Sequence, residues 1–273
     1  HYVKNVPLMS PRHKWAVTQL MLAKQMTLQQ VNELMQQLVS LANNVLVITA
    51  PEKEKDALPQ TEVWENFFSW VRTVEMEPYR TEKIDRPLLS EEITPGRVVK
   101  TKKGKYGSTV WMLKNGIRVV VLPTADSPYQ IVMNGQASGG LSMVPTEDYY
   151  SASMLAQLVS ASGVGDFTAE QLRKVLGGKA VNVQPVINRF STDINGSAAK
   201  GDVETMLQLT YLYFTRPNFD RGRFDMMIAA NRMNLENSVN SPDFMMTQMV
   251  NKVTYGDQPR TQIPNEQILA GID

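Results

Sequence analysis

Apolar residues recur at helical spacing in the first part of the chain. Ser10 followed by Pro11 predicts the start of a helix, because serine is a good N-cap and proline is favoured at the first helical position. The sequence Thr27-Leu28-Gln29-Gln30 fits a capping box, in which Thr and Gln satisfy each other's backbone amides. Apolar residues then follow three and four positions apart, at Leu28, Val31, Leu34, Met35, Leu38 and Val39. This spacing predicts a second, amphipathic helix that ends at Asn43-Asn44.

The next two apolar segments predict a strand and a helix. Residues 45–50 are a short run rich in β-branched side chains before Pro51, which predicts a buried strand. Thr61 is expected to cap a third helix. The apolar residues of that helix are Trp64, Phe67, Phe68 and Val71.

Residues 79–105 interrupt this regularity. The segment is charged, contains Pro87, Pro95, Gly96 and Gly104, and has no sustained period beyond the short run around Val98-Val99. We interpret it as a linker and domain boundary between residues 1–78 and 106–273.

The second half begins with strands. Residues 108–113 and 117–122 predict a hairpin, and Asn115-Gly116 favours a type I′ turn. Further strands are expected at 130–136, 180–186 and 189–195, with helices at 150–160, 168–176, 202–216, 224–237 and after Ser241-Pro242. Strands that arrive as hairpins, with helices grouped between them, predict an α+β fold with a layered, mostly antiparallel sheet.

The composition narrows the classes of function. The 273 residues include 28 basic and 27 acidic side chains, a net charge of +1, so nothing favours nucleic acid as a partner. The absence of cysteine excludes disulfides and thiol chemistry. The sequence contains no run of about 18 apolar residues, so no membrane span is predicted. The chain begins at His1 rather than methionine, and we interpret it as a segment of a longer protein.

Catalytic residues are scarce. A catalytic zinc site commonly uses histidines on one helical face with a carboxylate, but the chain has only His1 and His13. A serine triad lacks a base for the same reason, and no G-x-S-x-G motif is present. Carboxylates alone, for instance Asp225 or Glu236, leave a carboxylate-metal hydrolase as a third hypothesis, although solvated helix faces account for such residues.

Three stretches resemble the insulinase/pitrilysin family of inverted zinc-motif peptidases. They are Leu113-Lys114-Asn115-Gly116-Ile117-Arg118-Val119, Ala137-Ser138-Gly139-Gly140-Leu141-Ser142 and Tyr211-Leu212-Tyr213-Phe214-Thr215-Arg216-Pro217. The resemblance runs over most of residues 106–273. The pattern of residues 1–51 is similar to the tail of a preceding domain of the same family, so residues 1–78 are expected to be the C-terminal part of that domain plus an appended helix.

The resemblance implies a mitochondrial-processing-peptidase-like fold, with helices packed on one face of the sheet. In this family an N-terminal half carries an H-x-x-E-H helix, and a similar C-terminal half closes over it around an extended peptide. Here the equivalent helix would lie near residues 148–163, where Ser153, Met154, Leu155, Ala156 and Gln157 cannot bind catalytic zinc. The resemblance therefore implies that residues 106–273 are an inactive domain of the C-terminal-half type, with no catalytic or metal-ligating residue. Zinc is expected in the N-terminal half of the longer protein.

The implied function is a non-catalytic, substrate-enclosing part of a zinc metalloendopeptidase that degrades peptides or small unfolded proteins. The expected partners are that substrate and the H-x-x-E-H-bearing half of the same longer chain. The substrate is expected to add to a strand edge, with Ile131, Met133 and Gly135 as candidate binding residues. The alternative is a non-enzymatic scaffold or assembly module of the same fold. The expected location is the periplasm or cell envelope, with the cytoplasm as the alternative.

Overall fold

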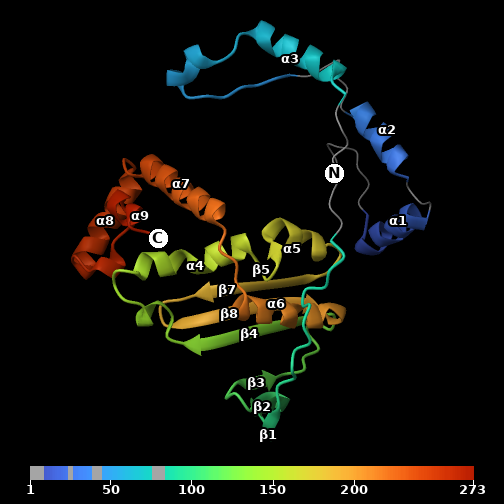
Figure 1. Cartoon of the computed structure of the whole chain (residues 1–273), viewed down its shortest axis with the longest axis vertical. Helices are drawn as coiled ribbons and strands as arrows, with labels where there is room; N and C mark the ends of the chain where they lie inside the picture. Colours follow the sequence, from blue (N-terminus) through green and yellow to red (C-terminus); the bar gives the residue numbers. More distant parts are fainter. Residues whose placement is uncertain (1–8, 24–26, 39–44, 76–83) are drawn as a thin grey trace. The chain divides into compact units, whose positions relative to one another are not determined.

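The structure is a computed structural model that describes residues 9–23, 27–38, 45–75 and 84–273. The chain divides into two units, His1–Tyr79 and Arg80–Asp273, which we call the N-terminal and the C-terminal unit (Figure 1). No helix in the described ranges is both long and apolar enough to cross a membrane.

The described part of the N-terminal unit is helical. Its elements are α1 (Pro11–Ala23), α2 (Leu28–Leu38), the 3-10 helix η2 (Glu52–Ala57) and α3 (Thr61–Thr73). The predicted first cap is confirmed, since the Ser10 hydroxyl accepts a hydrogen bond from the His13 amide at 3.2 Å. The capping box is also confirmed: the Thr27 amide donates to Gln30 Oε1 at 3.0 Å and the Gln30 amide to Thr27 Oγ1 at 3.2 Å. The predicted helix end at Asn43-Asn44 lies outside the described residues.

Two predictions for this unit are wrong. Residues 45–50 form no strand, and their apolar side chains are exposed, 86% for Val45 and 78% for Val47. A strand needs a hydrogen-bonding neighbour, and the described part of this unit contains helices but no second strand. Thr61 is the first residue of α3 rather than its cap, because Gln60 occupies the N-cap with extended backbone and no side-chain bond.

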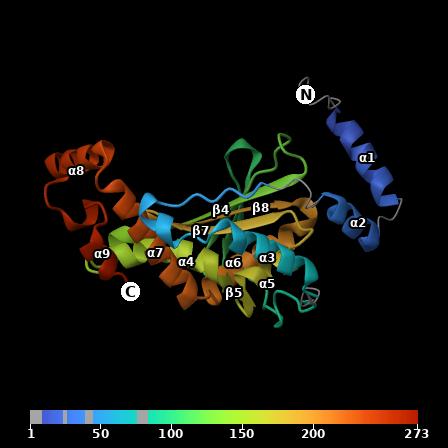
Figure 2. The ribbon, with the colours of Figure 1, turned by 90° about the horizontal axis from the view of Figure 1, so that it is seen from above.

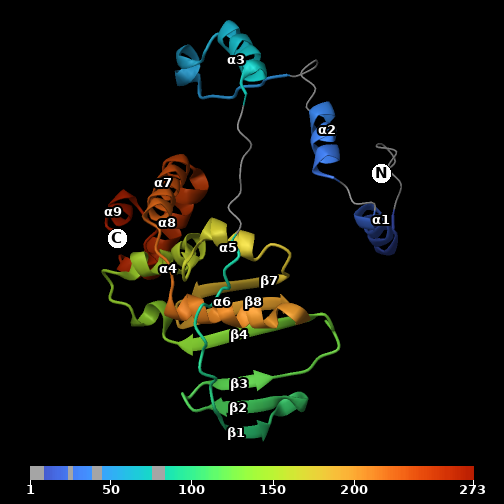
Figure 3. The ribbon, with the colours of Figure 1, turned by 45° about the vertical axis from the view of Figure 1, so that its right-hand side comes forward.

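The C-terminal unit is built on a three-stranded antiparallel sheet in the order β4-β8-β7 (Figure 3). Helices α4 and α6 pack against β7, and α6 also packs against β8. The predicted α+β fold, with a layered antiparallel sheet and helices on one face, is confirmed. Its strands are β1 (Val98–Lys103), β2 (Thr109–Leu113), β3 (Arg118–Val121), β4 (Gln130–Ser138), β5 (Gly163–Val164), β6 (Phe167–Thr168), β7 (Val181–Ile187) and β8 (Ser191–Ala199). Its α-helices are α4 (Tyr149–Ser162), α5 (Ala169–Val175), α6 (Val203–Thr215), α7 (Arg221–Ser238), α8 (Pro242–Tyr255) and α9 (Glu266–Ala270).

The predicted hairpin forms, but its turn differs from the prediction. Strands β2 and β3 pair antiparallel, and β1 adds to β2 to make a second sheet. The Leu113 amide bonds the Ile117 carbonyl at 2.8 Å, which leaves a three-residue loop. Gly116 has φ +89°, whereas Asn115 does not have positive φ. A type I′ turn needs positive φ at both central residues, so this loop is instead a turn closed by a left-handed glycine.

The segment 79–105 was expected to be a linker. Its described residues, from 84 onward, contact other parts of the C-terminal unit. Ile84, Leu88 and Leu89 pack against the core of the C-terminal unit. The Arg86 guanidinium lies 4.4 Å from the centre of the Phe167 ring. Strand β1 also falls within this range, and the sequence did not predict it because it is rich in lysine and exposed along its whole length, with no alternation to indicate a buried face.

The core lies between the covered face of the sheet and helices α5 and α6. Its fully buried side chains include Phe167, Met206, Leu212 and Val164. Between α4 and α5 the chain turns through the short β5–β6 hairpin at Gly163, whose φ of +96° excludes most side chains. A Cβ atom at Gly163 would lie 2.3 Å from the Phe167 carbonyl oxygen.

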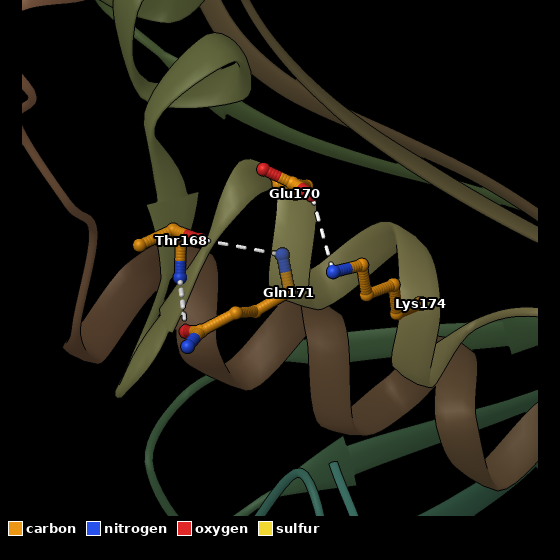
Figure 4. Close-up of polar contacts among 4 residues, drawn as sticks. All are labelled: Thr168, Glu170, Gln171 and Lys174. Carbon is orange, nitrogen blue, oxygen red and sulfur yellow. Dashed lines mark hydrogen bonds and ion pairs between the residues drawn. The ribbon is translucent and has the colours of Figure 1, made fainter. Parts of the chain in front are cut away.

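Helix α5 begins with the capping box predicted from Thr168 and Gln171 (Figure 4). The Thr168 amide donates to Gln171 Oε1 at 3.1 Å, and the Gln171 amide donates to Thr168 Oγ1 at 3.2 Å. Glu170 and Lys174 form an ion pair of 3.1 Å on the same helix. Together these contacts fix the start of a helix of only seven residues, which propensity alone would not hold.

Helices α7, α8 and α9 gather at one end of the unit, beside the start of α4 (Figure 2). Arg260, in the short η6 turn (Pro259–Thr261) between α8 and α9, ties them to that point. Its guanidinium donates to the carbonyls of Leu141 at 3.1 Å and Val144 at 2.5 Å, and to Thr146 Oγ1 at 3.2 Å. One side chain thus satisfies several acceptors in the loop that leads into α4.

We expect Arg260→Ala to loosen the C-terminal helices. Hydrogen bonds from a charged donor contribute on the order of 2 kcal/mol, so local opening of residues 242–270 should become about 30-fold more frequent. Amide hydrogen exchange resolved by peptide would measure it. Arg232→Ala is the matched control, because the Arg232–Glu266 pair is exposed and is expected to contribute little. Equal effects of the two substitutions would contradict the assigned role of Arg260.

A second prediction separates backbone strain from steric clash. Gly163→Ala should destabilise the C-terminal unit by at least about 3 kcal/mol, because it adds a backbone clash to an unfavourable φ. Gly178→Ala shares the positive φ, at +81°, but its Cβ would meet nothing within 4 Å, so a loss of only about 1 kcal/mol is expected. Urea unfolding followed by circular dichroism measures both, and similar losses would show that the clash is relieved.

Candidate functional site

Helix α4 occupies the position where the family resemblance expects the zinc-binding helix. Its residues 153–157 present a hydroxyl, a thioether, two aliphatic groups and an amide. The Ser153 hydroxyl is already used, donating to the Tyr150 carbonyl at 2.7 Å. None of these side chains fits the imidazole and carboxylate ligands of a catalytic zinc. Among residues 9–23, 27–38, 45–75 and 84–273, no three or more His, Cys, Asp or Glu side chains come together as a metal site.

The other candidate ligands lie apart. His13 is exposed on α1, and His1 lies outside the described residues. Asp225 forms an ion pair of 3.0 Å with Arg221 one helical turn away, and Glu236 is exposed further along α7. This arrangement matches the solvated helix faces to which the sequence analysis assigned these carboxylates.

A hollow of about 320 Å³ lies beside α4, between this helix, the start of α7 and Asp273. Most of its wall is apolar, from Met154, Leu155, Leu158, Phe219 and Phe224. Among its polar groups, the Ser151 hydroxyl donates to Asp273 Oδ1 at 3.4 Å, and Asp220 Oδ1 caps α7 by accepting from the Arg223 amide at 3.0 Å. The hollow therefore offers a mostly apolar surface, and none of its lining residues is a histidine or a cysteine.

Tyr150, on the same helix, is held by the C-terminal segment. Its hydroxyl lies 2.7 Å from the carbonyl oxygens of both Pro259 and Gln262. Burial, and to a smaller degree the neighbouring Tyr149, raise the pKa of Tyr150 above its usual value. Its phenol is therefore neutral at physiological pH and donates a structural hydrogen bond.

The predicted substrate-binding residues Ile131, Met133 and Gly135 all lie on β4, an edge strand of its sheet. Two bonds that flank β4 fix its hydrogen-bonding phase. The Lys200 amide donates to the Tyr129 carbonyl at 3.3 Å, and the Gly139 amide to the Phe190 carbonyl at 2.8 Å. Since backbone groups alternate in direction along an antiparallel strand, odd-numbered residues of β4 bond to β8.

This hydrogen-bonding phase determines which residues of β4 have backbone groups available to pair with an added strand. The backbone groups of Ile131, Met133 and Gly135 already face β8, and Met133 also packs against the core. The outward backbone groups belong to Val132, Asn134 and Gln136. The sequence carried a signal for this, because polar residues of β4 alternate with apolar ones, but the odd-numbered members that we named are those that bond to β8.

Strand β7 forms the other edge of the sheet, and there the even-numbered rather than the odd-numbered residues bond to β8. The Ala199 amide donates to the Ala180 carbonyl at 2.8 Å, so even-numbered residues of β7 bond to β8. Pro185 is therefore directed outward, where its missing N–H interrupts the edge. The outward edge of β4 contains no proline and keeps all its donors.

The antiparallel sheet with helices on one face defines an α+β protein with the insulinase-like fold. The crystal structure of the periplasmic protease PqqL from Escherichia coli matches with a TM-score of 0.63 and 18% identity, over 97% of this chain and 29% of that one. A mutant of the ferredoxin protease FusC, solved in complex with Arabidopsis ferredoxin, matches with a TM-score of 0.60 and 19% identity, over 79% of this chain and 24% of that one.

Curated sequences give the same relationship. A zinc protease PQQL-like protein of Arabidopsis thaliana is 29% identical over 134 residues, which are 47% of this chain and 14% of that protein. A probable zinc protease PqqL of Haemophilus influenzae is 23% identical over 188 residues, 68% of this chain and 20% of that protein. No family profile matches the chain. The resemblance to insulinase/pitrilysin-type zinc proteases is confirmed, and the matched region spans one fifth or less of these curated relatives.

The side chains around α4 lead to a prediction about zinc. After saturation with zinc and desalting, the purified chain should retain less than about one zinc per ten chains, because no His and carboxylate set of a tight site is present in the described residues. Atomic absorption measures the ratio. About one zinc per chain would contradict this expectation, and a His13→Ala variant would then test whether α1 contributes a ligand.

Proposed function

We propose that this chain is a non-catalytic, substrate-enclosing part of a zinc metalloendopeptidase that acts on peptides or small unfolded proteins. The observation that carries the proposal is α4, which lies where the family resemblance expects the zinc helix and carries Ser153, Met154, Leu155, Ala156 and Gln157. The relationship to zinc proteases supports peptide-bond hydrolysis by the longer protein. Zinc and the H-x-x-E-H motif would then belong to its N-terminal half.

We also propose the domain arrangement implied by this function. Residues 106–273 would be an inactive domain of the C-terminal-half type, and residues 1–78 the end of the preceding domain with an appended helix. The contacts of Arg86, Leu88 and Leu89 attach the described end of the intervening segment to the second of these domains.

The free edge of β4 is the proposed docking strand for substrate. An extended peptide can add there by backbone pairing, which gives affinity with little sequence preference. The earlier candidates Ile131, Met133 and Gly135 would support this strand from its bonded side, and Val132, Asn134 and Gln136 would pair with the peptide. FusC, solved with ferredoxin, supports small proteins as well as peptides as substrates. The periplasmic location of PqqL from Escherichia coli supports the periplasm as the compartment.

Reconstitution tests the proposed function. The chain and the H-x-x-E-H-bearing half of the same longer protein are purified separately and assayed with an internally quenched peptide. We expect no cleavage by the chain alone and at least about a tenfold higher kcat/KM for the mixture than for the other half alone, because the chain completes the substrate-binding chamber. Replacing the motif glutamate of the other half by glutamine should abolish cleavage by the mixture.

The controls separate this function from the alternatives. Zinc-dependent cleavage by the chain alone would overturn the non-catalytic assignment. A stable complex of the two halves without any increase in cleavage would instead support the scaffold hypothesis. Asn237→Asp, on the exposed side of α7, serves as a matched variant that should leave the increase unchanged.

A further inference from the structure

One face of the β4-β8-β7 sheet is left uncovered by helices, and we call it the open face. Along β8, the even-numbered residues Ile194, Gly196 and Ala198 are buried toward the helices. The odd-numbered residues point to the other side, and among them Asn195 is exposed although it lies on the central strand. A central-strand side chain can be exposed only where no second layer covers the sheet.

The register places three carboxamides in one row across this open face. Asn134 of β4 is opposite Asn195 of β8, which is opposite Gln184 of β7. Neighbouring side chains in such a row have Cβ atoms about 5 Å apart. All three residues are exposed, and their side chains make no hydrogen bond to another part of the described chain. We call Asn134, Asn195 and Gln184 the amide row.

Each of the two flanking rows contains two polar residues and one valine. One consists of Val132, Ser197 and Asn182, and the other of Gln136, Asp193 and Val186. Asp193 is the charged side chain in the three rows, and its Oδ2 atom accepts a hydrogen bond from Asn188 at 2.7 Å. The three rows contain no aromatic side chain, so they lack the stacking surface that favours sugars or nucleic-acid bases.

The chemistry of a carboxamide matches that of a peptide group. Each amide side chain has two N–H donors and one carbonyl acceptor, and an extended polypeptide presents one N–H and one carbonyl per residue. Because carboxamides carry no charge, such a surface distinguishes little between acidic and basic sequences. A wall of this kind suits a protein that must hold many unrelated sequences.

We propose that the amide row binds the backbone of an extended, unfolded polypeptide laid against the open face. This inference rests on the proposed function and adds a contact surface distinct from the β4 edge. The ligand class is polypeptide backbone, independent of side-chain charge. Binding should therefore change little with salt concentration, unlike binding to a charged patch.

Fluorescence anisotropy with the whole 273-residue chain tests the proposal. The ligand is an end-capped decapeptide of Gly, Ser, Thr and Val with a fluorophore at one end. The double variant Asn134→Asp/Asn195→Asp keeps side-chain shape but loses amide donors, and we expect its Kd to rise about tenfold. Asn195→Gln keeps the amide and should bind within about twofold of the original chain, as should the control Asn237→Asp on α7.

The outcomes separate this proposal from the function on which it rests. Binding that is equal in the original chain and in the double variant would overturn the amide row and leave the proposed function standing. No binding of the peptide by the original chain would overturn the amide row, and the reconstitution assay would then decide the function on its own. An equal rise in Kd for Asn237→Asp would also overturn the proposal, since the effect would then come from added negative charge.

Discussion

The hydrogen-bonding phase of β8 is the constraint on which the C-terminal unit depends. This strand lies between β4 and β7, so its even-numbered residues must bond one neighbour and its odd-numbered residues the other. The same alternation directs Ile194, Gly196 and Ala198 toward the helices. A Cβ at Gly196 would lie 2.9 Å from Met133 Cε and 3.0 Å from Met206 Sδ. The missing side chain thus lets α6 approach the sheet closely enough to bury Met206.

The same kind of packing accounts for several side chains of α4. Its buried residues Val159 and Ser162 lead directly into the tight hairpin at Gly163, while Met154 and Leu158 contribute to an apolar hollow. A zinc helix needs buried imidazoles whose second nitrogen is held by a further partner. Residues 153–157 of α4 are not of these types, and the described side chains of the helix supply packing and structural hydrogen bonds.

The sequence predicted the elements whose signals are local. The capping boxes at Thr27 and Thr168 and the proline start after Ser241 involve residues within one turn, and the structure has each of them. The two strand assignments that failed depended on a pairing partner that the local pattern does not reveal. The run at 45–50 has the composition of a strand but no partner in the described part of its unit. Charged β1 is a strand because β2 pairs with it. Candidate site residues show the same division: residue type alone excludes zinc ligands at 153–157, whereas the amide row is adjacent only through two strand registers.

The polarity of the open face also limits how the unit can be used. A sheet with two apolar faces needs helices on both sides, whereas this sheet buries one face and presents amide, hydroxyl and carboxylate groups on the other. Exposure of that face therefore costs little, and no second layer is required for stability. Its carboxamide, hydroxyl and carboxylate groups can hydrogen-bond to water, so the face needs no apolar partner; under the proposed function the same groups would pair with peptide N–H and carbonyl groups.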